Sequence, residues 1–245
     1  MIGSWLRSRR IRAEMVVATK VGRHPDNPGL HPRTVVAAVD ESLDRLGVER
    51  IDLLSLDGES ADVPIEDTLG ALAQLLEAGK IRAVGVSGFG RPTLERCEAA
   101  AARGLPEVQA IITEYNLLQR EPYETQIQPL AVSHNSCGLA RLPLANGFLT
   151  GDFRSKHDFP TSGMFMDAAA HAGRKGTKVL SVLDSIAAEL ETTPGRVGIA
   201  WVISRPGVAS AIARVQTGAQ VVDYLDATML TLTTDQLTRL DKVSS

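Results

Sequence analysis

The sequence predicts an α/β protein in which about six parallel β-strands alternate with helices. Two observations support this prediction. Short runs rich in valine and leucine, such as 15–20 and 51–57, are followed by glycine and have the length of buried parallel strands. Between them, 32–46 has its apolar residues at helical spacing, which completes a strand-helix-strand unit. The two strands end in Lys20 and Asp57, so both side chains are expected at the carboxyl end of the sheet.

The same alternation continues along the chain. Residues 1–12 resemble the end of a helix, and Gly47 stands where a left-handed cap would end the next one. Pro64 begins another helix and Gly79 ends it. The predicted strands are 15–20, 51–57, 81–86, 108–113, 138–142 and 208–213. The predicted helices that follow the first are 32–46, 64–78, 91–103, 122–135, 176–190, 194–204, 217–226 and 233–243.

The size of the chain suits one domain. Its 245 residues, 44% of them hydrophobic, can bury a sizeable core, and we expect a single domain over 1–245. The stretch 145–175 contains Gly, Asp and Ser and is too long for an ordinary connection, which predicts a lid. About six strands suggest an incomplete TIM-type barrel, which has eight when closed. An open doubly wound sheet is the rival, but no glycine-rich phosphate fingerprint follows any strand.

Composition argues against several classes of function. A formal net charge of -3 leaves no basic face for nucleic acid. Cys97 and Cys137 form no disulfide framework, and His134 and His157 have no partner at metal-ligand spacing. No apolar run approaches the roughly 18 residues of a membrane span, and no signal-peptide pattern is present. We therefore expect a cytoplasmic protein that takes a small-molecule substrate and binds neither nucleic acid, metal nor membrane.

Several motifs occur in a fixed order along the chain. They are VATKVG at 17–22, SLDRLG at 42–47 leading into IDLL at 51–54, AGKIRAVGVS at 78–87, YNLLQR at 115–120 and PLANGFLTG at 143–151. In this order they resemble the aldo-keto reductases, and the tail 197–241 continues the resemblance. The resemblance covers essentially the whole chain and implies a TIM-type barrel.

The resemblance also implies an NADPH-dependent carbonyl reductase with a catalytic tetrad of Asp, Tyr, Lys and His. Lys20 matches the lysine of the tetrad. The family's aspartate and tyrosine, together with its first two barrel strands, fall before residue 1 of this sequence. Asp57 stands in the place of the histidine. One of the four tetrad residues is thus retained.

Positions that hold the cofactor in the family also differ here. Ser87-Gly88 replaces a Ser-Asn pair, Ile112 replaces a glutamine, and Arg141 replaces the aromatic residue that stacks on the nicotinamide. Near the C-terminus, Gln216 replaces the arginine expected to contact the 2'-phosphate, and Tyr224 replaces an asparagine. From these differences we expect no cofactor, with NADPH binding weak or absent.

Three functions follow from this pattern. The first is cofactor-independent acid-base chemistry on a small organic molecule, such as dehydration, cyclisation or isomerisation, with Lys20 and Asp57 as the catalytic pair. The alternative is a non-catalytic binding or partner protein. The third is an ordinary NADPH-dependent carbonyl reductase whose N-terminal residues lie upstream of this sequence.

Four further residues are candidates for substrate binding: Glu59, Ser87, Tyr115 and Arg141. Each also has a structural alternative. Glu59 could be a solvated loop acid, and Arg141 could form a salt bridge to Asp57 or Glu114. Tyr115 could hold a strand end, and the Lys20–Asp57 pair could itself be only structural.

Two missing barrel strands would leave two unpaired strand edges and an uncovered apolar interior. The N-terminal helix, the lid or a second copy of the chain could cover them. A two-fold contact between copies covers both at once, so we expect a homodimer whose interface includes 1–20.

Overall fold

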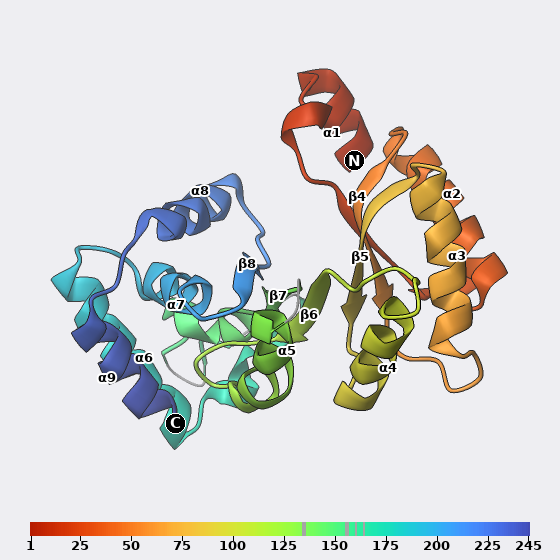
Figure 1. Ribbon diagram of the computed structural model, residues 1–245. Coiled ribbons are helices and arrows are strands. Elements are labelled where there is room, and N and C mark those ends of the chain that lie inside the picture. The colour runs from red at the N-terminus through yellow and green to blue at the C-terminus, as the bar shows by residue number, and fades with distance from the viewer. Residues whose placement is uncertain (134–135, 155–156, 160, 164) are drawn as a thin grey trace. The chain divides into compact units, whose positions relative to one another are not determined.

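The computed structural model describes residues 1–133, 136–154, 157–159, 161–163 and 165–245. In this part of the chain, six strands form one sheet in the order β1-β4-β5-β6-β7-β8, the order in which they occur along the sequence (Figure 1). Its strands are β1 (Ala18–Val21), β4 (Ile51–Asp57), β5 (Ile81–Ser87), β6 (Ala110–Glu114), β7 (Cys137–Arg141) and β8 (Val208–Ile212). Neighbouring strands pair in parallel wherever the register is defined. The predicted sheet of about six parallel strands is therefore confirmed.

The helices follow the strands as predicted. They are α1 (Ile2–Arg9), α2 (Pro32–Leu46), α3 (Ile65–Glu77), α4 (Arg91–Ala101), α5 (Gln128–Ser133), α6 (Arg174–Glu189), α7 (Pro194–Ile203), α8 (Gly218–Asp226) and α9 (Thr234–Ser244). The predicted helix 122–135 begins instead as a π-helical turn, Tyr123–Ile127, which leads into α5. A hairpin of two short strands, β2 (Arg23–His24) and β3 (Asn27–Pro28), was not predicted.

The chain forms two compact units, Met1–Ile112 and Thr113–Ser245, which we describe separately. We call them unit 1 and unit 2. The prediction of one domain over 1–245 stays a prediction. Four residues of the predicted lid, numbers 155, 156, 160 and 164, and His134 lie outside the described residues. The described parts of the predicted lid include two 3-10 helices, Ala145–Thr150 and Met166–His171.

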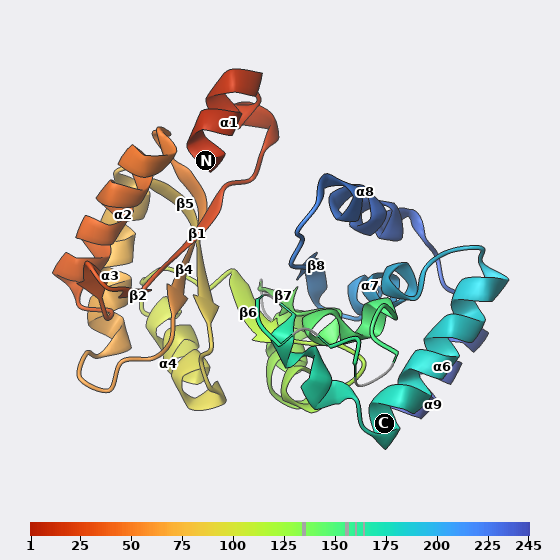
Figure 2. The same ribbon diagram turned by 180° about the vertical axis from the view of Figure 1, so that it is seen from behind.

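In unit 1, α2 and α3 lie against one face of β1, β4 and β5 (Figure 2). Along β4, Leu54 and Leu56 are fully buried and share one face, while Ser55 and Asp57 share the other because side chains alternate along a strand. Gly47 ends α2 in a left-handed conformation with φ 63°, as predicted. The unit thus has one helix-covered face and one face that carries polar residues near its carboxyl end.

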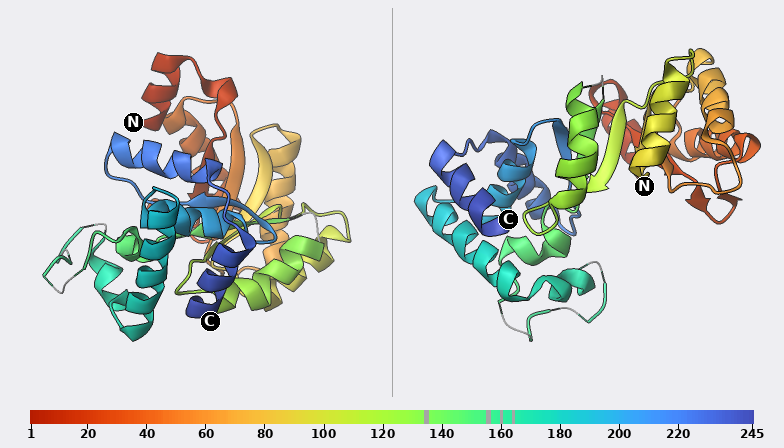
Figure 3. Two further views of the ribbon diagram at one scale, coloured as in Figure 1. Left: turned by 90° about the vertical axis from the view of Figure 1, so that its left-hand side faces the viewer. Right: turned by 60° about the horizontal axis from the view of Figure 1, so that its bottom comes forward.

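In unit 2, helices surround a core built from large side chains. Trp201, Tyr115, Tyr123, Leu149 and Leu183 are among its largest fully buried residues. Helices α6 and α9 lie side by side (Figure 3), and α6 also packs on α7. Within the described residues, no helix is long and apolar enough to cross a membrane. The cytoplasmic location stays a prediction.

Candidate functional site

Lys20 and Asp57 meet at the carboxyl ends of β1 and β4. Lys20 pairs in register with Ser55, so its side chain lies on the sheet face of Ser55 and Asp57. Its Nζ donates a hydrogen bond to Asp57 Oδ2 at 2.9 Å. The Lys20 side chain is 46% exposed and that of Asp57 is 17% exposed, so the ammonium can reach a ligand from solvent. The structure therefore brings together the two residues predicted as the catalytic pair.

Asp57 remains a carboxylate because three groups compensate for its burial. Burial alone would raise its pKa, but a hydrogen bond and positive charge from Lys20, a hydrogen bond from Ser87 and the charge of Arg23 lower the pKa below its ordinary value. Ser87 ends β5, next to Asp57 in register. Ser87, which is predicted to bind substrate, thus contacts Asp57 of the predicted catalytic pair.

Arg23 belongs to the same cluster and was not predicted as a site residue. Its Nε lies 3.6 Å from Asp57 Oδ1, opposite the oxygen that binds Lys20, and its side chain is 71% exposed. Arg23 comes three residues after Lys20, in the β2–β3 hairpin. The sequence feature that could have pointed to Arg23 is its position, three residues after the lysine at the end of a predicted strand.

Beneath this cluster, Ser55 presents a buried hydroxyl. It is 1% exposed, and its Oγ has no hydrogen-bond partner in the described part of the chain. A Cβ on Gly85 of the neighbouring strand would come within 2.7 Å of this oxygen, so glycine is the residue that fits there. Ser55 was not predicted as a site residue, because a lone serine in a strand has no distinctive spacing.

Glu59 contacts the start of a helix. Its Oε1 accepts a hydrogen bond of 2.7 Å from the backbone N–H of Gly90, the residue before α4. A carboxylate at this end of a helix interacts favourably with its dipole. The contact favours a structural role, and substrate binding by Glu59 stays a prediction.

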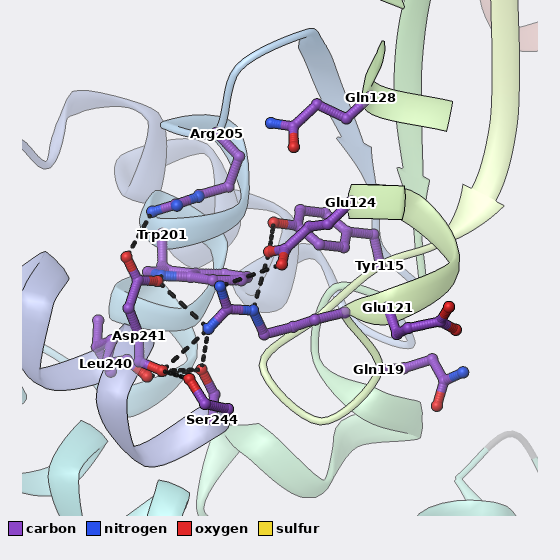
Figure 4. Close-up of polar contacts among 12 residues, drawn as sticks. Tyr115, Gln119, Glu121, Glu124, Gln128, Trp201, Arg205, Leu240, Asp241 and Ser244 are labelled. Carbon is purple, nitrogen blue, oxygen red and sulfur yellow. Dashed lines mark hydrogen bonds and ion pairs between the residues drawn. The ribbon is translucent and has the colours of Figure 1, made fainter. Parts of the chain in front are cut away.

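Tyr115 is completely buried in unit 2. Figure 4 shows its ring beside Glu124 and Trp201, and its hydroxyl donates a hydrogen bond of 2.8 Å to Glu124 Oε1. Its ring centroid lies 4.3 Å from that of Tyr123 and 5.4 Å from that of Trp201. Burial, followed by the bond to Glu124, raises the pKa of this hydroxyl far above its ordinary value. These contacts favour the structural alternative for Tyr115.

Arg141 lies at the end of β7 and pairs with Glu114 at the end of β6. Its guanidinium is 3.7 Å from the Glu114 carboxylate, and the two side chains are 42% and 31% exposed. This is one of the salt bridges considered from the sequence. A role in substrate binding stays a prediction. Among the described residues, no group of three or more His, Cys, Asp or Glu side chains could hold a metal ion.

Comparison with known proteins identifies the family. The sequence model of the "Aldo/keto reductase family" matches residues 1–245. The chain belongs to the aldo/keto reductase family. It is 32% identical over 213 residues to the "Aldo-keto reductase yakc [NADP(+)]" of Schizosaccharomyces pombe, which covers 83% of this chain and 62% of that relative. It is also 26% identical to the "Aldo-keto reductase YhdN" of Bacillus subtilis, covering 96% of this chain and 72% of YhdN.

A solved structure has the same fold. The crystal structure of a thermostable aldo-keto reductase, Tm1743, superposes with a TM-score of 0.78 over 99% of this chain and 76% of that one, at 23% identity. Six strands of a TIM-type barrel are therefore present. The chain spans about three fifths of the length of the yakc relative and about three quarters of Tm1743.

Family membership corrects two predictions. The expected cofactor-independent chemistry and the expected absence of a cofactor are both wrong, because the family is one of oxidoreductases and the yakc relative is named for NADP(+). The error has a physical reason. The prediction judged cofactor binding by side-chain identity, whereas backbone N–H groups and helix N-termini can bind phosphate groups whatever the side chains are.

Proposed function

We propose that this protein reduces a carbonyl compound with NADP(H). The observation that supports this most directly is the 2.9 Å contact between Lys20 and Asp57, placed at the carboxyl ends of two neighbouring barrel strands in an aldo/keto reductase chain. Active sites of TIM-type barrels lie at this end of the strands. Lys20 is also the residue that matches the family's lysine.

Lys20 can hold the carbonyl oxygen. Its ammonium has three N–H donors, and Asp57 takes one of them at Oδ2. The remaining donors can bind the substrate oxygen, stabilise the negative charge that develops there during reduction, and give the proton that completes the alcohol. Asp57 and its partner Ser87 keep the ammonium in place. The half-exposed Lys20 side chain leaves room for the substrate on its solvent side.

Unit 2 has a feature that fits the phosphate groups of NADP(H). Helix α8 begins at Gly218, and a Cβ at this residue would meet nothing within 4 Å, so the space beside the helix start is open. The exposed Arg214 lies in the loop just before it. The Thr217–Gln220 capping box already binds the N–H groups of Gln216, Thr217 and Gln220, so the N–H groups of Gly218 and Ala219, with an arginine nearby, are the ones that would suit a phosphate. Within unit 2, the residues that would hold a phosphate group of NADP(H) are Arg214 and the first residues of α8.

The test is NADPH oxidation by the purified protein, followed at 340 nm with a panel of aldehydes and ketones. We expect turnover with at least one of them, and a thermal stability that increases with NADPH concentration. Lys20→Met should lower kcat about a hundredfold, as for the loss of a donor to a developing oxyanion. Lys80→Met is the matched control, because Lys80 pairs with Asp40 on the surface. No turnover and no stabilisation at millimolar NADPH would refute the proposal.

We also propose that the protein is a homodimer whose interface includes 1–20. Strand β1 is at one end of the strand order, and Val16 just before it is 77% exposed. A groove of about 380 Å³ lies beside it, and Ile2, Trp5 and Met15 are among its lining residues. An unpaired edge next to an apolar groove can pair with the same edge of a second copy. Light scattering at micromolar concentration should give the dimer mass, and Val16→Lys should shift it toward the monomer. A monomer in the wild-type protein would contradict this.

A further inference from the structure

We propose that the substrate carries an anionic group, a carboxylate or a phosphate, in addition to its carbonyl, and that Arg23 binds this group. This inference rests on the proposed function and names the class of substrate for the same site. It follows from how charge is distributed around Asp57.

Two cations share one carboxylate at this site. Lys20 Nζ lies 2.9 Å from Asp57 Oδ2, and Arg23 Nε lies 3.6 Å from Asp57 Oδ1. Asp57 is ionised, because its pKa is lowered, and it can neutralise only one of the two. The cluster therefore keeps one positive charge, in a protein whose formal net charge is -3.

Among the described residues, neither of two further acids near the cluster, Glu59 and Asp26, forms an ion pair with Lys20 or Arg23. The Glu59 carboxylate is bound to the backbone N–H of Gly90 at the positive end of α4. Asp26, in the same hairpin as Arg23, lies 3.5 Å from His24 and is 71% exposed. An anionic group at Arg23 would thus meet the positive charge that Asp57 leaves over, without displacing Glu59 or Asp26 from its present contact.

Arg23 has the donors that such a ligand needs. A guanidinium offers five N–H groups in a planar fork that matches a carboxylate or a phosphate. Its 3.6 Å approach to Asp57 is longer than a hydrogen bond, and 71% of the side chain is exposed, so most of the fork faces solvent. Gly22, with φ 116°, turns the chain immediately after β1. Because Lys20 and Arg23 contact the two oxygens of one carboxylate, a short substrate whose carbonyl oxygen binds Lys20 can place its anionic group on Arg23.

The test compares aldehydes that differ in one anionic group. Butanal is paired with 4-oxobutanoate, and glycolaldehyde with glycolaldehyde phosphate. We expect the wild-type protein to prefer the anionic member of at least one pair by about tenfold or more in kcat/KM, the size of one hydrogen bond to a charged group. The pair that shows the preference distinguishes carboxylate from phosphate. Arg23→Gln should lower that ratio about tenfold. Arg82→Gln, at an exposed position near the opposite end of β5, should keep it.

A second measurement does not need turnover. Succinate and inorganic phosphate are used as probes in thermal unfolding of the wild-type, Arg23→Gln and Arg82→Gln proteins. Stabilisation by one of them that Arg23→Gln removes would support the anion site even if no aldehyde were reduced, in which case only the proposed function fails. Reduction of all four aldehydes with no anionic preference would overturn the inference and leave the proposed function intact. The absence of both anionic preference and stabilisation would also overturn it.

Discussion

Asp57→Asn isolates the charge of the candidate site, because asparagine keeps the shape of the side chain. Asp57 binds Lys20 at 2.9 Å, and the lysine side chain is 46% exposed, so water screens the pair. Two unit charges at this distance in a water-like dielectric attract each other by about 1.4 kcal/mol. That energy corresponds to about a tenfold change in a rate or equilibrium constant.

We therefore expect Asp57→Asn to lower kcat/KM for carbonyl reduction about tenfold. The free energy of unfolding at pH 7 should fall by about 1 kcal/mol. NADPH absorbance measures the first quantity and urea unfolding the second. Asp26→Asn is the matched control, because Asp26 is 71% exposed in the neighbouring hairpin, and it should change neither quantity. Wild-type values of both in Asp57→Asn would refute the reasoning.

The pH dependence of the same variant has a definite sign. The pKa of Asp57 is lowered in the folded protein from the ordinary value of 3.8. The stability that its charge contributes is therefore present above pH 3.8 and lost as the pH falls through the folded pKa. The difference in unfolding free energy between the wild-type protein and Asp57→Asn should be constant from about pH 7 to about pH 5 and shrink below about pH 4.

Three further predictions concern buried groups. Arg120→Ala should lower the free energy of unfolding by about 3 kcal/mol in urea, since this side chain is 16% exposed, binds Glu124 through two N–H groups and stacks on Trp201. Tyr115→Phe should lower it by about 1 kcal/mol in the same assay and leave kcat unchanged, because it removes one hydrogen bond inside the core. The thiol of Cys97, whose pKa burial raises to about 11, should resist Ellman's reagent at pH 8 until urea unfolds the protein.

Each of these three predictions has either a control variant or an outcome that would contradict it. Arg91→Ala removes a pair with Glu95 in which both side chains are about half exposed, so it should cost about 0.5 kcal/mol or less. A cost as small as this in Arg120→Ala would contradict the importance of its contacts. A lower kcat in Tyr115→Phe would support the predicted substrate role. Reaction of Cys97 in the folded protein, measured in a Cys137→Ser background, would show that its thiol is accessible.

Local signals were sufficient for most of the secondary structure. The predicted helix 32–46 and strand 51–57 coincide with α2 and β4, because apolar periodicity and the cap at Gly47 depend only on neighbouring residues. The predicted strand 15–20 was less accurate, and β1 begins at Ala18. The residues just before Ala18 do not continue the regular strand pairing with β4, because the backbone N–H of Val17 donates its hydrogen bond to the side chain of Asp52.

The part of the candidate site that lies at the ends of consecutive parallel strands could be predicted from the sequence. Lys20 and Asp57 end consecutive parallel strands, and such ends meet at one edge of a sheet, so their contact could be expected. Arg23 was missed because its strand has two residues and no periodic pattern. The burial of Tyr115 was also beyond the sequence, because it depends on side chains such as Trp201, far along the chain.

The sequence by itself determined the family, the parallel sheet and the pair Lys20–Asp57. Motif order, apolar periodicity and the residues at strand ends can all be read from the order of residues without knowing the tertiary structure. Only the tertiary structure decided how charges and hydroxyls are partnered. It places Arg23 beside the second carboxylate oxygen of Asp57 and lets Glu59 accept a hydrogen bond from the backbone N–H of Gly90. It also leaves the hydroxyl of Ser55 without a partner in the described part of the chain. The physical reason is that hydrogen bonds and ion pairs depend on distances of a few ångströms between residues that are far apart in sequence.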